Sequence, residues 1–288
     1  MKNIKLPERY NYVEAYLTLR CNFNCTYCIN KDGELVRERK ELTAEQWVDG
    51  LNRIDFGQIS LTLGGGEATI HKGFYNILRD LKPEIKVDLL TNLQFDVDEL
   101  IKNIKPDRFN QRKIPAYRSI RVSYHIGQSN PEEIIEKSKK LQDAGFSVGI
   151  FGLDHPKFIN ENMKLMESAI ENKIFFFPKN FLGYWNGRLY GTYKYYEGLS
   201  GERKKVKCRT RELLIDPAGD VYKCHRDLYK REGSLDNILN PDFEIGDKFR
   251  LCENFGECNA CDLKLKTNFY LDSVDCQIEI EEVKDKED

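Results

Sequence analysis

The stretch VEAYLTLRCNFNCTYC, residues 13–28, joins an apolar run to three closely spaced cysteines. Its first seven residues, rich in β-branched and apolar side chains, predict a strand. Cys21, Cys25 and Cys28 follow this strand in a C-x3-C-x2-C arrangement. Such close spacing lets three thiolates converge on one small inorganic centre, and no fourth ligand lies nearby in the sequence. The stretch therefore predicts a metal-binding loop that leaves one metal position open for another ligand.

Five further apolar runs predict strands, and helical patterns separate them. These runs are residues 59–63, 87–90, 119–124, 147–151 and 174–177. Thr43 with Gln46 forms a capping box that opens one helix, and Pro131 at a first-turn position opens another. Because parallel strands need crossover connections, six strands separated by helices predict an α/β fold with a parallel sheet.

Polar and glycine-rich residues follow several of these strands directly. They include Gly64–Glu67, Asn92 and His125. Functional groups of α/β folds gather at the carboxyl ends of the strands, so these residues are candidate site residues together with Cys21. His125 can face a substrate there, and a hydrogen-bonded rim histidine is the alternative.

The pattern changes after residue 180. Residues 181–207 contain five tyrosines and five glycines without a period, and they are predicted to be a linker. From residue 208 onward the chain is rich in cysteine, with short predicted strands that turn at Pro217–Gly219. We therefore expect a barrel-like domain over 1–180, a linker over 181–207 and a small cysteine-rich domain over 208–288.

Composition and charge exclude several classes of protein. The chain has 288 residues with 45 basic and 47 acidic side chains, so its net charge of −2 gives no reason to expect nonspecific binding to nucleic acid or anionic lipid. No apolar stretch approaches the roughly 20 residues that cross a bilayer, and the N-terminus has no apolar signal-peptide core. Nine cysteines in two separate groups, in a protein expected in the reducing cytoplasm, predict two metal sites.

The first cysteine group and the residues around it resemble the radical S-adenosylmethionine (SAM) superfamily. The resemblance covers residues 13–178 and implies a partial (β/α)6 TIM-like barrel. In that family C-x3-C-x2-C holds a [4Fe–4S] cluster whose open iron binds SAM. The reduced cluster cleaves SAM to methionine and a 5′-deoxyadenosyl radical, which removes a hydrogen atom from the substrate. A structural zinc site is the alternative for Cys21, Cys25 and Cys28, although it would require a fourth ligand.

The resemblance also implies residues that surround SAM. Tyr27 occupies the aromatic position expected near the adenine, and the GGE motif that binds the SAM amino group matches Gly65, Gly66 and Glu67. The remaining two implied SAM contacts are Asn92, at the end of the third strand, and Ser123, at the end of the fourth. Ala68 departs from the family pattern, in which proline usually follows GGE.

The second cysteine group resembles the SPASM and twitch auxiliary-cluster domains. Cys208 and Cys224 enclose a C-x10-G-x4-C pattern, and Cys258 with Cys261 forms a C-x2-C pair. This set implies one auxiliary [4Fe–4S] cluster, because the longer SPASM continuation is absent. Cys252 can replace one of the four ligands. Cys276 is expected to be a buried thiol, and zinc is the alternative metal.

The implied function is C–H activation by a radical SAM enzyme of the oxidoreductase type, through oxidation or epimerisation of a small-molecule substrate. The resemblance also implies an external electron donor such as flavodoxin or ferredoxin. Because the first predicted strand begins near residue 13, no peptide-binding domain is expected before it, and a peptide is the less favoured substrate. The alternatives are a ribosomal-peptide maturase of the same superfamily and a non-catalytic zinc or iron–sulfur binding module. No hydrolase-type catalytic residues are recognised.

Overall fold

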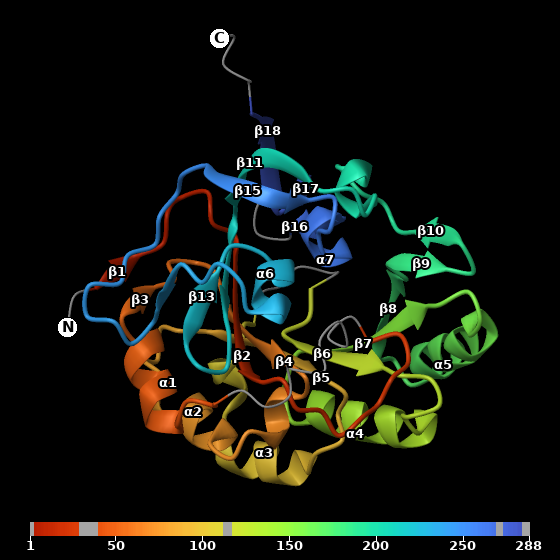
Figure 1. Cartoon of the computed structure of the whole chain (residues 1–288). Helices are drawn as coiled ribbons and strands as arrows, with labels where there is room; N and C mark the ends of the chain where they lie inside the picture. Colours follow the sequence, from red (N-terminus) through yellow and green to blue (C-terminus); the bar gives the residue numbers. More distant parts are fainter. Residues whose placement is uncertain (1–2, 29–39, 112–116, 269–272, 284–288) are drawn as a thin grey trace, which may run out of the picture.

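A nine-stranded sheet forms the centre of the protein (Figure 1). The computed structural model describes residues 3–28, 40–111, 117–268 and 273–283. Six neighbouring strands of the sheet are parallel: β2 (Tyr12–Thr18), β4 (Leu61–Gly65), β5 (Val87–Thr91), β6 (Ile120–Tyr124), β7 (Val148–Asp154) and β8 (Phe175–Asn180). They correspond to the six predicted strands, so the predicted α/β fold with a partial barrel is confirmed.

Helices connect the parallel strands. They are α1 (Ala44–Leu51), α2 (Phe74–Asp80), α3 (Val97–Asn103), α4 (Pro131–Asp143) and α5 (Ile159–Glu171). The predicted capping box of Thr43 and Gln46 is present at the start of α1, and Pro131 begins α4. The α3 helix follows an Asp96 cap that was not predicted. Short 3-10 turns lie at Ala68–Ile70, Pro106–Arg108 and Tyr196–Leu199.

Side chains alternate between two faces of the parallel strands. On β2, Val13, Ala15 and Leu17 belong to the large apolar core, whereas Tyr12 and Tyr16 pack in a different cluster with residues of the C-terminal segment. Trp47 of α1 is fully buried in the large core. Since successive strand residues point to opposite faces, the first set faces the helices and the second faces the interior of the partial barrel.

The sheet continues into the cysteine-rich segment. Strand β12 (Glu212–Ile215) pairs in parallel with β2, and Glu212 lies opposite Tyr12. Strands β13 (Asp220–Tyr222) and β14 (Asp236–Asn237) then extend the sheet by antiparallel pairing. The segment expected as a separate domain therefore contributes three strands to the central sheet.

The remaining elements lie around this sheet. The N-terminal part adds β1 (Ile4–Lys5) and β3 (Ile54–Asp55), which pair with each other. The segment expected as a linker holds the hairpin β9 (Gly183–Trp185) and β10 (Arg188–Tyr190). The C-terminal elements are β11 (Lys204–Thr210), α6 (His225–Lys230), β15 (Arg250–Phe255), α7 (Ala260–Leu263), β16 (Leu265–Asn268), β17 (Ser273–Cys276) and β18 (Ile278–Glu282). No helix among the described residues has the length and apolar character required to cross a bilayer.

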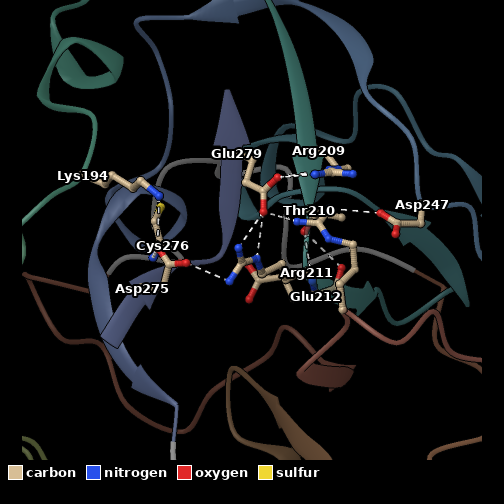
Figure 2. A network of polar contacts seen from close by, with 10 residues as sticks. Lys194, Arg209, Thr210, Arg211, Glu212, Asp247, Asp275, Cys276 and Glu279 are labelled. Carbon is tan, nitrogen blue, oxygen red and sulfur yellow. Dashed lines mark hydrogen bonds and ion pairs between the residues drawn. The ribbon is translucent and has the colours of Figure 1, made fainter. Parts of the chain in front are cut away.

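A cluster of charged side chains holds the last strand in position. Figure 2 shows Glu279 of β18 beside Arg209 and Arg211, which both donate hydrogen bonds to its carboxylate. Arg9 from the N-terminal segment donates to the same carboxylate. Arg211 also pairs with Asp275 at 2.8 Å. Charge-assisted bonds of this kind are stronger than neutral ones, so Glu279 ties β18 to β11 and to the N-terminal segment.

Candidate functional site

The loop after β2 carries the first three cysteines. The backbone N–H of Cys28 donates to the Cys25 carbonyl at 3.2 Å, and the N–H of Phe23 donates to the Cys21 sulfur at 3.3 Å. These contacts fold the segment back on itself. Cys25 is buried, Cys28 is half-buried and Cys21 is exposed. The three thiols thus lie on one tight loop that reaches from the interior to the surface.

The two glycines Gly65 and Gly66 allow β4 to approach this loop closely. A Cβ atom at Gly65 would lie 2.1 Å from the Thr18 carbonyl oxygen, and one at Gly66 would lie 2.0 Å from that of Arg20. Gly65 also has a φ of +123°, which side chains rarely adopt. The N–H of Gly66 donates to the Thr18 carbonyl at 2.9 Å. Any larger residue at these two positions would push the cysteine loop away from the sheet.

Glu67 is a buried connection between two strand ends. Its carboxylate accepts hydrogen bonds from the Thr69 hydroxyl at 2.7 Å, the Thr91 hydroxyl at 2.8 Å and the Asn92 backbone N–H at 2.6 Å. Burial raises the pKa of Glu67, while these hydrogen bonds work in the opposite direction. The predicted SAM-binding carboxylate therefore also fixes the end of β5 relative to the turn after β4.

Asn92 extends the contact from β5 to the cysteine loop. Its side-chain amide donates to the Asn22 side-chain carbonyl at 2.7 Å and approaches the Cys21 sulfur at 3.9 Å. Ser123 is half-buried near the carboxyl end of β6. The structure therefore brings Glu67 and Asn92 together beside Cys21, while Ser123 lies two strands from β4 in the same sheet.

Tyr27 packs among aromatic side chains at the carboxyl ends of β6 and β7. Its ring lies 6.2 Å from the His125 ring in a stacked arrangement and 5.5 Å from the His155 ring. Burial, followed by the positive charge of Lys179, lowers the pKa of His125 to about 4, so its ring is neutral at physiological pH. The Nδ1 atom of His125 is buried without a hydrogen-bond partner among the described residues. The sequence pattern identified Tyr27, but gave no sign of the packing around it.

Trp185 of the β9–β10 hairpin completes this aromatic group. Its ring lies 4.4 Å from the His155 ring, and Phe181 lies 4.6 Å from the same ring. His155 itself is almost completely buried. The hairpin expected as part of a linker therefore packs against the same histidine that contacts Tyr27. Pairs of aromatic residues scattered between 155 and 185 carry no regular spacing that sequence reasoning can use.

Four of the six cysteines in the second group line one cavity. Cys208 from β11, Cys224 before α6, Cys252 from β15 and Cys258 before α7 all line it. No disulfide joins any of the nine cysteines. Burial raises the pKa of Cys224 well above its usual value and that of Cys258 to about 12. A bound metal ion makes such buried thiols ionise, and thiolate sulfur is the ligand that iron–sulfur clusters and zinc prefer. These four residues fit such a centre.

Cys261 and Cys276 lie outside that cavity lining. The sulfur of Cys261 is 3.9 Å from the Lys264 ammonium nitrogen, and Cys261 is half-buried. Cys276 is buried, as expected, and its thiol donates to the Asp262 carbonyl at 3.1 Å. The predicted set was Cys208, Cys224, Cys258 and Cys261. The cavity instead contains Cys252, the alternative that the sequence left open.

A buried polar network supports this cavity and was not found from the sequence. The Asp262 carboxylate accepts from the backbone N–H groups of His225 and Arg226 at the start of α6, and from the His225 ring. Glu212 of β12 lies 3.5 Å from the same ring. Burial opposes the charged form of His225, but Glu212 and Asp262 raise its pKa to about 9. The only sequence signal was an acidic residue directly after the C-x2-C pair.

Comparison with known proteins identifies the family. The family model of the "Radical SAM superfamily" matches residues 16–171, more than half of the chain. This chain belongs to the radical SAM superfamily. The members of this superfamily are enzymes that use a [4Fe–4S] cluster and SAM. The cysteine-rich C-terminal segment is compatible with an auxiliary cluster in addition.

Individual radical SAM relatives are similar over part of their length. The GTP 3',8-cyclase of Nautilia profundicola is 31% identical over 106 residues, which is 35% of this chain and 33% of that enzyme. The chain thus spans about a third of this curated relative. SuiB of Streptococcus suis bound to its precursor peptide SuiA has a TM-score of 0.57 at 17% identity, over 81% of this chain and 63% of SuiB. The peptide-bound anSMEcpe has a TM-score of 0.54 at 14% identity, over 90% of this chain and 81% of anSMEcpe.

Proposed function

We propose that this radical SAM enzyme activates a C–H bond of a small molecule and so oxidises or epimerises it. An auxiliary iron–sulfur cluster assists this reaction. When bound, SAM and the reduced cluster supply a 5′-deoxyadenosyl radical that removes the hydrogen atom. One observation carries this proposal. The ring of Tyr16, on the strand that leads into the first cysteine loop, lies 6.4 Å from the ring of His225, which directly follows Cys224, so the two cysteine groups approach a common region. A substrate between them would contact both.

In this proposal Cys21, Cys25 and Cys28 hold the SAM-binding cluster. Tyr27, Gly65, Gly66, Glu67, Asn92 and Ser123 surround SAM. The hydrogen bonds from Asn92 to the cysteine loop and from Asn92 to Glu67 support this arrangement, because they hold the loop and the GGE segment in a fixed relation before SAM binds.

For the auxiliary cluster we propose the ligands Cys208, Cys224, Cys252 and Cys258. This set keeps three of the ligands expected from the sequence and substitutes Cys252 for Cys261. Its support is the common cavity that the four thiols line. The auxiliary cluster would then either accept an electron from the substrate or bind the substrate. An external donor such as flavodoxin or ferredoxin would reduce the SAM-binding cluster. Cysteines that serve as cluster ligands and form no disulfides support a location in the reducing cytoplasm.

A ribosomal-peptide maturase is the second candidate. The observation that favours it is the similarity in fold to SuiB with its precursor peptide and to peptide-bound anSMEcpe. The sequence similarity to GTP 3',8-cyclases favours a small molecule instead, since their name identifies a nucleotide substrate. Only the substrate differs between the two candidates. Their proposed cofactors and cysteine ligands are the same.

The test uses anaerobically purified and reconstituted protein. We expect roughly eight irons per chain and slow release of 5′-deoxyadenosine from SAM after reduction, even without substrate. Changing Cys21, Cys25 and Cys28 together to Ala should remove about half of the iron and all SAM cleavage. Changing the buried Cys276 to Ala is the matched control and should alter neither. Wild-type protein that binds zinc, or that holds iron but never releases 5′-deoxyadenosine, would contradict the proposal.

A further inference from the structure

Lys179 lies near the end of β8, on the face that lines the interior of the barrel. In the β7–β8 pairing it lies opposite Leu153, and its ammonium nitrogen is 5.2 Å from the centre of the Phe151 ring. Phe151 and Leu153 are two residues apart on β7 and share a face. The positive charge of Lys179 acts on His125, whose ring stacks on Tyr27 of the first cysteine loop. Lys179 therefore borders the proposed SAM site.

Lys264 supplies a second cation from the C-terminal segment, and its positive charge acts on Lys179. It follows α7, and its ammonium nitrogen lies 3.9 Å from the Cys261 sulfur. Its backbone forms a β-bridge with Tyr193, whose hydroxyl accepts a hydrogen bond from the N–H of Gly183 at 2.8 Å. Gly183 comes only four residues after Lys179. The chain therefore holds the end of β8 and Lys264 close together.

Neither of these two cations has a carboxylate partner in the part of the chain that the structure describes. Among the residues that the structure describes, no ion pair within 4.0 Å involves the ammonium group of Lys179 or Lys264. Burial, with the charges of Lys264 and Arg121, lowers the pKa of Lys179 to about 8. Arg121 itself pairs with Asp88 at 3.1 Å. A half-buried cation without a partner is unfavourable for the folded protein unless something else supplies the negative charge.

One interior carboxylate whose charge acts on Lys179 is already used by other groups. Glu14 of β2 accepts hydrogen bonds from the hydroxyl groups of Tyr12 at 2.8 Å and Tyr16 at 3.2 Å. The other carboxylate oxygen of Glu14 lies over Gly64, so that a Cβ atom on Gly64 would be 2.2 Å from this oxygen. Glu14 is therefore held against β4 by its own contacts. A bound anion would supply the negative charge that no carboxylate of the described residues places within ion-pair distance of Lys179 or Lys264.

We propose that Lys179 and Lys264 bind an anionic group of the substrate, a carboxylate or a phosphate, between the two cysteine groups. This inference rests on the proposed function, because it assigns the substrate of the same site. Because the two lysines come from different segments, both can bind such an anion only when β8 and α7 are folded next to each other. An ammonium group is a compact positive charge that donates hydrogen bonds to carboxylate and phosphate oxygens alike, so both anions share this chemistry.

The experiment measures thermal unfolding of the reconstituted protein under anaerobic conditions, with sodium pyrophosphate, sodium succinate or sodium chloride at equal ionic strength. Pyrophosphate, succinate or both should raise the unfolding temperature of the wild type by about 2–4 °C over chloride, because a ligand that binds the folded state stabilises it. Stabilisation by pyrophosphate alone assigns a phosphate-bearing substrate, and stabilisation by succinate alone assigns a carboxylate.

The variants decide where the anion binds. Lys179→Met and Lys264→Met should each abolish the stabilisation by the anion, and Lys179→Met should unfold at a higher temperature than wild type in chloride because it removes an unpaired cation. Lys164→Met on the exposed face of α5 is the matched control and should keep the wild-type response. An equal response of Lys179→Met and wild type, or no response of the wild type to either anion, would overturn the inference. These results do not depend on SAM cleavage, whose absence from the wild type would instead overturn the proposed function.

Discussion

The carboxylate of Asp262 accepts hydrogen bonds from both the backbone N–H and the ring Nδ1 of His225, each at 2.7 Å. His225 is the first residue of α6 and directly follows Cys224, whereas Asp262 lies in α7 just beyond Cys258 and Cys261. The pair therefore joins two cysteine-bearing segments that are 37 residues apart in the sequence. It fixes the relative position of their thiols through a side chain that is itself buried.

Replacing Asp262 by Ala should weaken the auxiliary centre without affecting the first one. The change leaves the N–H groups at the start of α6 and the buried His225 ring without their acceptor, and each lost bond to a charged group costs about 1.5–3 kcal/mol. We expect iron content to fall from roughly eight toward roughly four per chain. Electron paramagnetic resonance of the reduced protein should lose one of its two cluster signals. Asp262→Asn, which keeps an acceptor oxygen, should retain more iron than Asp262→Ala, and equal iron in both variants and wild type would contradict this role.

Cys252 and Cys261 should respond differently to substitution. If Cys252 is a ligand of the auxiliary cluster, Cys252→Ala should remove about four irons per chain, whereas Cys261→Ala should keep them. Iron and sulfide analysis of both variants, prepared side by side, measures this difference. The opposite result would restore the ligand set expected from the C-x2-C pair. Loss of iron in both variants would mean that five cysteines contribute to binding.

To test the role of Glu67 in SAM binding, a substitution should preserve the hydrogen bonds of its side chain as far as possible. Glu67→Ala would break the contacts to Thr69, Thr91 and Asn92, and would therefore disturb the cysteine loop as well as SAM binding. Glu67→Gln keeps the size and one acceptor oxygen but removes the charge that would attract the SAM ammonium group. We expect Glu67→Gln to keep the iron of the first cluster while its affinity for SAM, measured by equilibrium dialysis, falls about tenfold or more. A wild-type affinity would show that Glu67 acts only between the strands.

The charged cluster around Glu279 predicts a loss of stability in acid. Burial alone would raise the pKa of Glu279, but the hydrogen bonds from Arg209 and Arg211 and the charge of Arg9 lower it overall. A lowered pKa in the folded state adds stability above the unfolded value near 4.3, and this stability is lost as the pH falls below that value. The free energy of unfolding should therefore decrease more between pH 5 and pH 3 in wild type than in Glu279→Gln. Denaturant titrations at several pH values measure it, and parallel curves for the two proteins would contradict the prediction.

The sequence was most informative where a pattern is local. The six parallel strands, the capping box at Thr43 and the helix that starts at Pro131 were all predicted, because each depends on residues close together in the chain. The C-x3-C-x2-C loop was recognised for the same reason. The α3 helix was missed although Asp96 caps it and Val97, Leu100 and Ile101 follow with helical spacing.

Contacts between distant segments could not be predicted. The choice between Cys252 and Cys261 depends on how β15 lies beside β11, and the register that puts Val206 opposite Cys252 leaves no trace in the spacing of the cysteines. The polar partners of Glu67 lie 2 to 25 residues away, and its family motif gives no indication of them. The position of Lys264 similarly depends on its β-bridge with Tyr193, in a segment that has no regular pattern.

The parallel pairing of β12 with β2 has a consequence for biosynthesis. Glu212 and Tyr12 lie opposite each other although they are about 200 residues apart, so this contact contributes a long loop closure to folding. While the ribosome is still producing the chain, one edge of β2 has no neighbour, and unpaired strand edges are templates for association with other chains. Polypeptides that end before residue 212 should therefore aggregate on release, and chaperone binding should be strongest before β12 has been synthesised.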